Sequence, residues 1–350
     1  MQAMAVIAVV ACVSMLCMDF TKTGASMIEC NDDVCLPEFY YNTTNFILIN
    51  FAHADITGDN VADAIATGLT AASGECNNAS LIYFTKETGT WQKKNINNSM
   101  ICQGFGSVYA GDGDGDGRNE VFAFHSGDAA HSSANYLRMF YSDDGGDTWD
   151  YDVINESFAD GGVVIMELAD VDLDGNKELV MGFGSLSQSS DLAALWVYEY
   201  SGGIWQLAAV ANVTGDNGVY ALDTGQLDDD PAVEIVVGTD DGVGYPELGG
   251  ADETGYIATY EYNGTLNLDT VINETAGKTV LNLYIGDFDH DHENELVDYI
   301  GGDGFAGLQV YDRNSAGEWE NNYWYDDSCS GGEGCAGRLS PVVYGDVDNR

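Results

Sequence analysis

Aspartates recur in this sequence at positions 1, 3 and 5 of a nine-residue motif that ends in another acid. The motif is most regular at residues 112–120 (DGDGDGRNE) and at residues 170–178 (DVDLDGNKE). Calcium is a hard cation that takes about 6–8 oxygen ligands. Three alternate carboxylates, a carbonyl at position 7 and a carboxylate at position 9 would complete such a shell. The spacing therefore predicts calcium loops.

Six copies of this pattern, called acidic motifs 1 to 6, run along the chain. They begin at residues 55, 112, 170, 226, 287 and 346, so the steps are 57, 58, 56, 61 and 59 residues. Motif 5 (287–295) is close to the pattern, motifs 1 (55–63) and 4 (226–234) depart further, and motif 6 is cut off by the end of the sequence. A fixed period of this kind predicts a repeat architecture.

The candidate ligands occupy positions 1, 3, 5, 7 and 9 of the motifs. They are Asp55, Thr57, Asp59 and Asp63 in motif 1; Asp112, Asp114, Asp116, Arg118 and Glu120 in motif 2; Asp170, Asp172, Asp174, Asn176 and Glu178 in motif 3; Asp228, Asp230 and Glu234 in motif 4; Asp287, Asp289, Asp291, Glu293 and Glu295 in motif 5; and Asp346 and Asp348 in motif 6. We expect about four to five Ca²⁺ sites.

Position 6 ranks the motifs, because the turn needs a positive φ that only Gly reaches freely. Motifs 2 and 3 have Gly there, and motif 1 has Asn60, which enters the left-handed region more easily than most residues. His292 in motif 5 is less favourable, and Pro231 in motif 4 is worst because its ring holds φ near about −65°. Motif 4 also begins with the neutral Gln226. The predicted order is motifs 2 and 3, then 5, then 1, then 4.

The flanks of the motifs predict strands. An EF-hand loop begins in the same way, but it needs Glu at position 12 and a helix on each side. Motif 3 instead lies between apolar runs of strand length, residues 163–166 and 179–181. Plain hairpin turns without metal are the alternative interpretation of the Asp-Gly pattern.

A second pair of strands is predicted after each motif, with turns rich in Gly, Asn, Ser and Asp. The first runs are 81–84, 137–141, 195–200, 256–262 and 308–311, and their partners begin near Trp91, Trp149, Trp205, Leu268 and Trp319. Four strands per period predict an all-β β-propeller of four-stranded blades with calcium loops. We expect five complete blades and the start of a sixth, truncated from six to eight, or else a short chain closing with five. The recurring Trp is expected to pack between blades.

On these features the chain resembles the FG-GAP or VCBS repeat family, whose best-known members are the propeller heads of integrin α subunits. The resemblance covers about residues 46–350 and includes small residues before the motifs and Gly at the end of the next strand. These are Gly111, Ala169, Gly225, Gly286 and Gly345, and Gly182, Gly238 and Gly301. The resemblance implies calcium on one face of the propeller and ligand-binding loops on the other.

Residues 142–149 (SDDGGDTW) fit the S-x-D-x-G-x-T-W pattern of the Asp-box. They resemble the hairpins of sialidase-like propellers, in which the box is structural. A sialidase needs several arginines to bind the substrate carboxylate. This sequence has Arg118, Arg138, Arg313, Arg338 and Arg350. The box therefore favours propeller hairpins over hydrolysis.

The net charge of −47 excludes some partners. A surface this acidic repels nucleic acid and anionic lipid, so neither is an expected partner. The hydrophobic content of 45%, with its strand periodicity, argues against disorder.

The N-terminal region predicts export. Residues 4–18 are apolar but too short for a transmembrane helix. We expect a signal peptide in residues 1–26, although no basic residue precedes its core, then an N-terminal segment in residues 27–45 and the propeller in residues 46–350. A lipoprotein box ending at Cys12 is the alternative.

Cysteines and glycosylation sequons also indicate a secreted or cell-surface protein. The spacing favours the pairs Cys30–Cys35, Cys76–Cys102 and Cys329–Cys335, with other pairings open. Sequons begin at Asn42, Asn78, Asn97, Asn155, Asn212, Asn263 and Asn273.

The leading functional hypothesis is an extracellular calcium-binding module for adhesion to a glycan or protein ligand, with no direct membrane insertion. The long connections at residues 125–136, 184–193 and 239–255 are the expected ligand surface. The alternative is a calcium-dependent polysaccharide lyase or other carbohydrate-active propeller enzyme, for which His125 and His131 are the candidate bases. The sequence shows no Ser/His/Asp or Cys/His constellation, and we expect no catalytic site.

Overall fold

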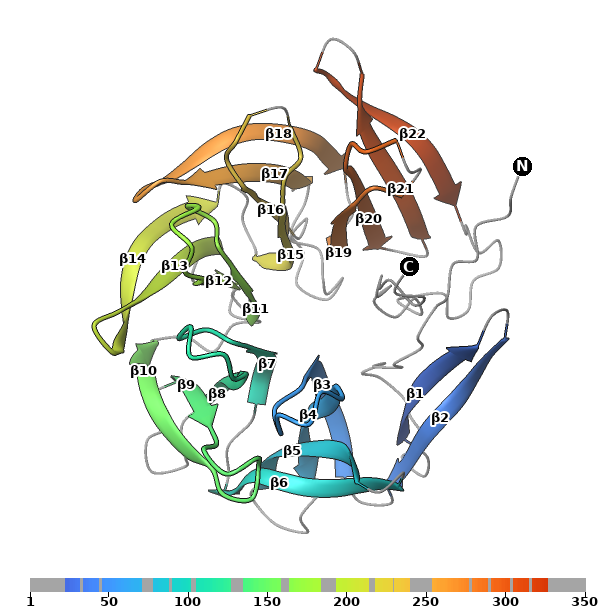
Figure 1. Cartoon of the computed structure of the whole chain (residues 1–350). Coiled ribbons are helices and arrows are strands. Elements are labelled where there is room, and N and C mark those ends of the chain that lie inside the picture. Colours follow the sequence, from blue (N-terminus) through green and yellow to red (C-terminus); the bar gives the residue numbers. More distant parts are fainter. Residues whose placement is uncertain are drawn as a thin grey trace.

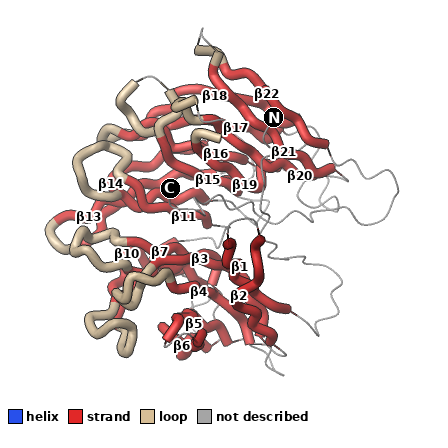
Figure 2. Tube along the Cα trace, turned by 45° about the vertical axis from the view of Figure 1, so that its right-hand side comes forward, coloured by secondary structure: helices blue, strands red, loops and turns tan. Residues whose placement is uncertain are grey.

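The computed structural model describes sixteen stretches of the chain. They are residues 23–31, 34–43, 46–70, 78–87, 90–101, 105–126, 135–158, 164–183, 193–213, 218–228, 230–239, 254–276, 279–288, 291–302, 305–314 and 317–326. These stretches contain strands and loops but no helix, as Figure 2 shows. The strands form five four-stranded antiparallel sheets and one two-stranded hairpin. The predicted all-β class is therefore confirmed.

Each sheet is built from consecutive strands that pair in chain order. Sheet 1 contains β3 (Phe46–Ala54), β4 (Asp63–Thr70), β5 (Asn78–Glu87) and β6 (Thr90–Ile101). Sheet 2 contains β7 (Phe105–Gly111), β8 (Glu120–Ser126), β9 (Asn135–Tyr141) and β10 (Asp150–Phe158). Sheet 3 contains β11 (Val164–Ala169), β12 (Glu178–Phe183), β13 (Ala193–Ser201) and β14 (Ile204–Val213). Sheet 4 contains β15 (Val219–Gly225), β16 (Glu234–Thr239), β17 (Thr254–Tyr262) and β18 (Leu266–Ala276). Sheet 5 contains β19 (Thr279–Gly286), β20 (Glu295–Gly302), β21 (Phe305–Arg313) and β22 (Trp319–Asp326).

The remaining two strands form an N-terminal hairpin, β1 (Thr23–Asn31) and β2 (Val34–Thr43). Strand β1 begins inside residues 1–26, the segment expected to be a signal peptide. The backbone register places Cys30 opposite Cys35, the pair favoured by spacing. The other predicted cysteine pairs lie outside the described residues, as does acidic motif 6 with Asp346 and Asp348.

The five sheets follow one another around a common centre, with the first strand of each sheet innermost (Figure 1). These first strands contact one another in sequence order, β3 with β7, β7 with β11, β11 with β15, and β15 with β19. The hairpin contacts sheet 1 through β1 and β3. Each repeat of the sequence is thus one sheet, and its neighbours in the sequence are its neighbours in space.

Apolar side chains fill the spaces between successive sheets. Four buried clusters join sheets 1 and 2, 2 and 3, 3 and 4, and 4 and 5. Trp205 of sheet 3 packs edge-on against Phe122 of sheet 2, with ring centroids 5.5 Å apart. Trp149 of sheet 2 packs against Tyr83 of sheet 1 in the same manner, at 5.8 Å. The tryptophans at these two positions therefore pack between sheets, as expected.

Glycine near the end of the second strand lets the next sheet approach closely. A Cβ atom at Gly182 would lie 2.5 Å from Cγ1 of Val219, and one at Gly238 would lie 2.3 Å from Cγ1 of Val280. Real Cβ atoms do not approach that closely, so these glycines have a packing role. This gives a physical reason for the glycines that the sequence repeats at the end of this strand.

Candidate metal sites

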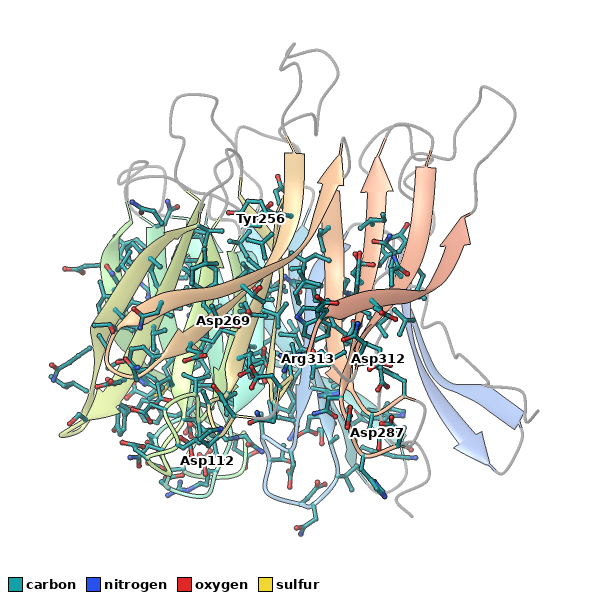
Figure 3. The ribbon with its side chains drawn as sticks, turned by 90° about the horizontal axis from the view of Figure 1, so that it is seen from above. Asp112, Tyr256, Asp269, Asp287, Asp312 and Arg313 are labelled. Carbon is teal, nitrogen blue, oxygen red and sulfur yellow. The ribbon has the colours of Figure 1, made fainter. Side chains whose placement is uncertain are left out.

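The acidic motifs occupy the same place in every sheet. Each one follows the last residue of the first strand, and its position 9 is the first residue of the second strand. The strand ends pair directly, as in Gly111 with Glu120 and Ala169 with Glu178. In Figure 3, Asp112 of motif 2 and Asp287 of motif 5 lie at the same edge of the molecule. The repeat therefore places its acids on one side.

The position-9 acid is buried in all five described motifs, with 0 to 4% of the residue exposed. One of its carboxylate oxygens accepts a hydrogen bond from the backbone N–H of position 2. The donor and acceptor pairs are Ile56 with Asp63 (3.0 Å), Gly113 with Glu120 (2.9 Å), Val171 with Glu178 (3.0 Å), Leu227 with Glu234, and Phe288 with Glu295 (2.6 Å). This bond ties the start of the loop to the second strand.

A second bond joins position 6 to the aspartate at position 1. The N–H groups of Asn60, Gly117, Gly175 and His292 donate to Asp55, Asp112, Asp170 and Asp287 over 2.7 to 3.1 Å. The φ angles at the four donors are +65°, +88°, +94° and +79°. The positive φ predicted for position 6 is thus observed in these four motifs, including at the less favourable His292.

Position 4 also takes a positive φ, which the sequence analysis missed. Gly58 and Gly115 have φ values of +75° and +77°, and Leu173 has +61°. Leu173 is an exposed apolar residue in a backbone region that glycine favours. Glycine at position 4 of motifs 1 and 2 could have predicted this positive φ, but motif 3 has Leu173 there, so the glycine is not a constant feature of the motif.

Three acids converge in each of motifs 2 to 5, with one oxygen from each lying within 4.8 Å of the others. The groups are Asp112, Asp114 and Glu120; Asp170, Asp172 and Glu178; Asp228, Asp230 and Glu234; and Asp287, Asp291 and Glu295. Among the described residues, motif 1 does not form such a group, although Asp55, Thr57, Asp59 and Asp63 are all described. Asp289 of motif 5 lies outside the described residues. Several of these acidic clusters could therefore hold a metal ion.

Burial and mutual repulsion make these carboxyl groups resist ionisation. Burial raises the pKa of Glu120 to about 8, and the neighbouring Asp114 adds to the rise. Burial likewise raises the pKa of Glu178 and of Glu234 to about 7 in each case. The N–H of position 2 acts in the opposite direction but does not offset burial. A cation among the three acids would favour their ionised forms.

Motif 3 provides a direct test of whether a cation fits. Oδ2 of Asp170 accepts the N–H of Gly175, whereas Oδ1 is buried and accepts no hydrogen bond from the described residues. A buried carboxylate oxygen without a donor is costly unless a cation or water satisfies it. The all-oxygen donor set suits a hard cation such as calcium or magnesium.

The backbone N–H of position 7 helps to hold the aspartate at position 5. The N–H groups of Arg118, Asn176 and Glu293 donate to the position-5 aspartates Asp116, Asp174 and Asp291, over 2.8, 2.8 and 2.9 Å. The Arg118 side chain lines a cavity beside Asp114 and Glu120 and pairs with Asp143. Its Nε also lies 3.4 Å from Oδ2 of Asp116.

The Asp-box forms the hairpin between β9 and β10. Asp144 accepts hydrogen bonds from the hydroxyl of Ser142 (2.9 Å) and from both the N–H and the hydroxyl of Thr148 (2.8 and 2.7 Å). The Tyr83 hydroxyl of sheet 1 donates to the carbonyl of Gly146 over 2.9 Å. The box thus rigidifies the hairpin and attaches it to the preceding sheet.

His125, a candidate base of the enzyme hypothesis, is completely buried in β8. Its ring stacks on Tyr136 with centroids 5.3 Å apart. A polysaccharide cannot reach this imidazole in the fold. The other candidate, His131, lies outside the described residues.

The third strand of the next sheet also reaches the motifs, which the sequence analysis did not foresee. Arg313 of sheet 5 lies beside Asp228 of motif 4, with Nη1 3.6 Å from Oδ2. Tyr200 of sheet 3 lines a cavity of about 180 Å³ together with Asp114 and Glu120 of motif 2. Burial raises the pKa of Tyr200, and Asp114 adds to the rise. The strand register puts Arg313 and Tyr200 at the same place in the third strand of their sheets. The connections before these strands differ in length, so the two residues do not lie at a constant distance from the motifs in the sequence.

In comparisons with known proteins, no protein-family model matches the chain and no significant match is found among curated proteins. The described residues contain no helix with the length and apolar character needed to span a bilayer. Functional inference therefore depends on the repeated geometry of the motifs.

Proposed function

We propose that the protein is an extracellular, calcium-stabilised β-propeller of the FG-GAP or VCBS type that binds a glycan or protein ligand. The observation that carries this proposal is the repetition of one unit, a strand, an acidic loop and a second strand, in five successive sheets. The sheets are arranged around a common centre with their first strands inside, which is how propeller blades are arranged.

Calcium is the cation that this site chemistry favours. Three carboxylates converge in motifs 2, 3 and 5, with no nitrogen or sulfur ligand in the converging groups, and calcium takes about 6–8 oxygen ligands. The role we propose for the ion is structural. It would neutralise crowded carboxyl groups and fix the hairpin between the first two strands of each blade that binds it.

A binding role follows from how the strands are directed. The ends of β8, β12 and β16 lie opposite the acidic motifs, because the motifs occupy the starts of the same strands. The long connections expected to recognise a ligand begin at these ends. A rigid scaffold that carries variable loops at one edge is a common design for recognition. The net charge of −47 makes a neutral or basic ligand the more compatible one.

The test is retention of the full chain on immobilised ligands, in millimolar calcium and in chelator. The panel should contain neutral, basic and acidic glycans and extracellular matrix proteins. The variant Asp170→Asn, which removes one candidate calcium ligand of motif 3, is compared with the wild-type chain on the same panel. We expect retention on at least one ligand in calcium, with loss in chelator. Time-dependent shortening of an acidic polysaccharide without stable retention would contradict the binding role and favour a lyase.

A further inference from the structure

We infer that acidic motif 4 holds no metal ion, because the Arg313 guanidinium supplies the positive charge that calcium supplies elsewhere. This inference rests on the proposed calcium binding by the other motifs. It separates Asp228, Asp230 and Glu234 from the remaining candidate ligands, although these three acids also converge and Oε1 of Glu234 is buried without a donor among the described residues.

The first observation concerns Gln226, which stands where motifs 1, 2, 3 and 5 have aspartate. Its side-chain Nε2 donates to the backbone carbonyl of Asp228 over 2.8 Å and also to the carbonyl of Asp230. The amide therefore presents N–H groups to the loop, where the other motifs present a carboxylate. A hydrogen-bond donor at this position closes the loop by itself and would repel a cation.

The second observation concerns Pro231 at position 6. In the other described motifs the N–H of this position donates to the position-1 aspartate. Proline has no N–H, and its ring disfavours a positive φ. Motif 4 has thus lost both partners of that bond, and the Gln226 amide has replaced it.

The third observation is the position of Arg313. Its Nη1 lies 3.6 Å from Oδ2 of Asp228, with 27% of the Arg313 side chain and 21% of the Asp228 side chain exposed. Nε and Nη2 each donate to the carbonyl of Gly317 over 3.2 Å, and the guanidinium lies 5.8 Å from the centroid of the Trp319 ring. Oδ1 of Asp228 accepts the N–H of Asp230 over 2.8 Å. Asp114 and Asp172 accept the equivalent N–H in motifs 2 and 3, so the contact with Arg313 is what distinguishes Asp228.

Arg118 in motif 2 shows that an arginine near a motif is not enough. Its guanidinium contacts Asp116, which is outside the three converging acids of that motif, and its main partner is Asp143. Arg313 instead contacts Asp228, a member of the converging group in motif 4. Figure 3 places Arg313 on sheet 5, so the charge comes from the next repeat.

The first arm of the test counts the calcium ions bound per folded chain by equilibrium dialysis. Asp172→Asn and Asp228→Asn change the same position, 3, in motifs 3 and 4. We expect Asp172→Asn to lose one ion and Asp228→Asn to keep the wild-type number. Loss of one ion in both variants would overturn the inference and leave the calcium proposal intact. A wild-type chain that binds no calcium would overturn the calcium proposal and, with it, the contrast between motifs.

The second arm asks whether Arg313 itself excludes the ion. The double variant Gln226→Asp/Pro231→Gly restores the loop but keeps Arg313, and we expect the wild-type number of ions. Adding Arg313→Gln should gain one ion. A gain already present in the double variant would overturn the role of Arg313, as would no gain in a folded triple variant. Folding is checked by a cooperative melt of each variant. If the triple variant does not fold, the first arm still decides whether motif 4 holds an ion.

Discussion

The position-9 carboxyls are buried, and in motifs 2, 3 and 5 a bound cation and protons would compete for the same oxygens. Each of them accepts a hydrogen bond from the N–H of position 2 of its own loop, and the loop brings further acids toward it. Without a cation, the ionised carboxylates of a motif repel one another, and protonation reduces that repulsion. The pH dependence of stability should therefore differ with and without a bound cation.

We expect the metal-free protein to lose stability as the pH rises through the folded pKa values. Glu120, Glu178 and Glu234 have pKa values of about 8, 7 and 7 in the fold, against 4.5 for an ordinary glutamate. Between pH 4.5 and about pH 8, these three carboxyls are protonated in the folded chain but ionised in the unfolded chain. The free energy of unfolding therefore falls as the pH rises through this range. Thermal melts in chelator should show a higher Tm near about pH 5 than near about pH 8. Calcium needs the ionised carboxyls, so through Glu120 and Glu178 of motifs 2 and 3 it should stabilise most at the higher pH. A Tm in chelator that does not fall over this range would contradict the assignment.

The two positive-φ positions of motif 3 make opposite predictions. A Cβ at Gly175 would meet nothing within 4 Å, so Gly175→Ala should destabilise only through its φ of +94°, by about 1 kcal/mol. Leu173 has a φ of +61° and is 55% exposed, so Leu173→Gly should stabilise by up to about 1 kcal/mol. Denaturant unfolding in chelator measures both. The same sign of change in the two variants would refute the proposed backbone strain.

At the scale of elements, the sheets are held together by apolar clusters between neighbours. Trp205 is the second residue of the fourth strand of sheet 3, yet its ring packs on Phe122 of sheet 2 and its Nε1 donates to the sulfur of Met139, 3.2 Å away. Only 8% of Trp205 is exposed. The neighbouring Ile204 is 59% exposed.

These neighbours provide a matched pair for the interface between sheets. We expect Trp205→Ala to cost about 3–5 kcal/mol, because the cavity opens between two sheets. Ile204→Ala should change the free energy of unfolding by less than about 0.5 kcal/mol. Equal costs, measured by denaturant unfolding in calcium, would show that the tryptophan is not an interface residue.

Sequence periodicity predicted most of these elements for a clear reason. A strand that is buried on one or both faces needs a short apolar run, and turn residues must separate the runs, so the four strands per repeat were visible. The contacts of Arg313 and Tyr200 with the preceding motifs were not. They depend on strand register, and the unequal lengths of the connections before β13, β17 and β21 remove the constant spacing that would have revealed them.

The candidate sites were predictable to a similar degree. The acids of motifs 2, 3 and 5 converge because alternate residues of a tight turn point to one side. The ranking from position 6 did not anticipate that the acids of motif 4 would converge and those of motif 1 would not. Convergence depends on how the whole loop folds, including the second positive φ at position 4 and the amide of Gln226.

At the scale of the whole molecule, the chain has a net charge of −47, and Asp112 and Asp287 of acidic motifs 2 and 5 lie at the same edge (Figure 3). Five sheets meet through their first strands, so a destabilised loop in one sheet weakens its packing on the next. Cations bound in several motifs would reduce the repulsion and stabilise the joined sheets together. Calcium, if bound as proposed, would then be part of what stabilises the fold.

The most direct test is thermal unfolding of the full chain in calcium and in chelator, with magnesium as the control cation. The account predicts a higher Tm in calcium that continues to rise with the calcium concentration, because each site stabilises by about 2.7 kcal/mol at a hundredfold excess over its Kd. Magnesium should give a smaller shift, since it requires a tighter octahedral shell. Superimposable melts in calcium and in chelator would contradict the central claim.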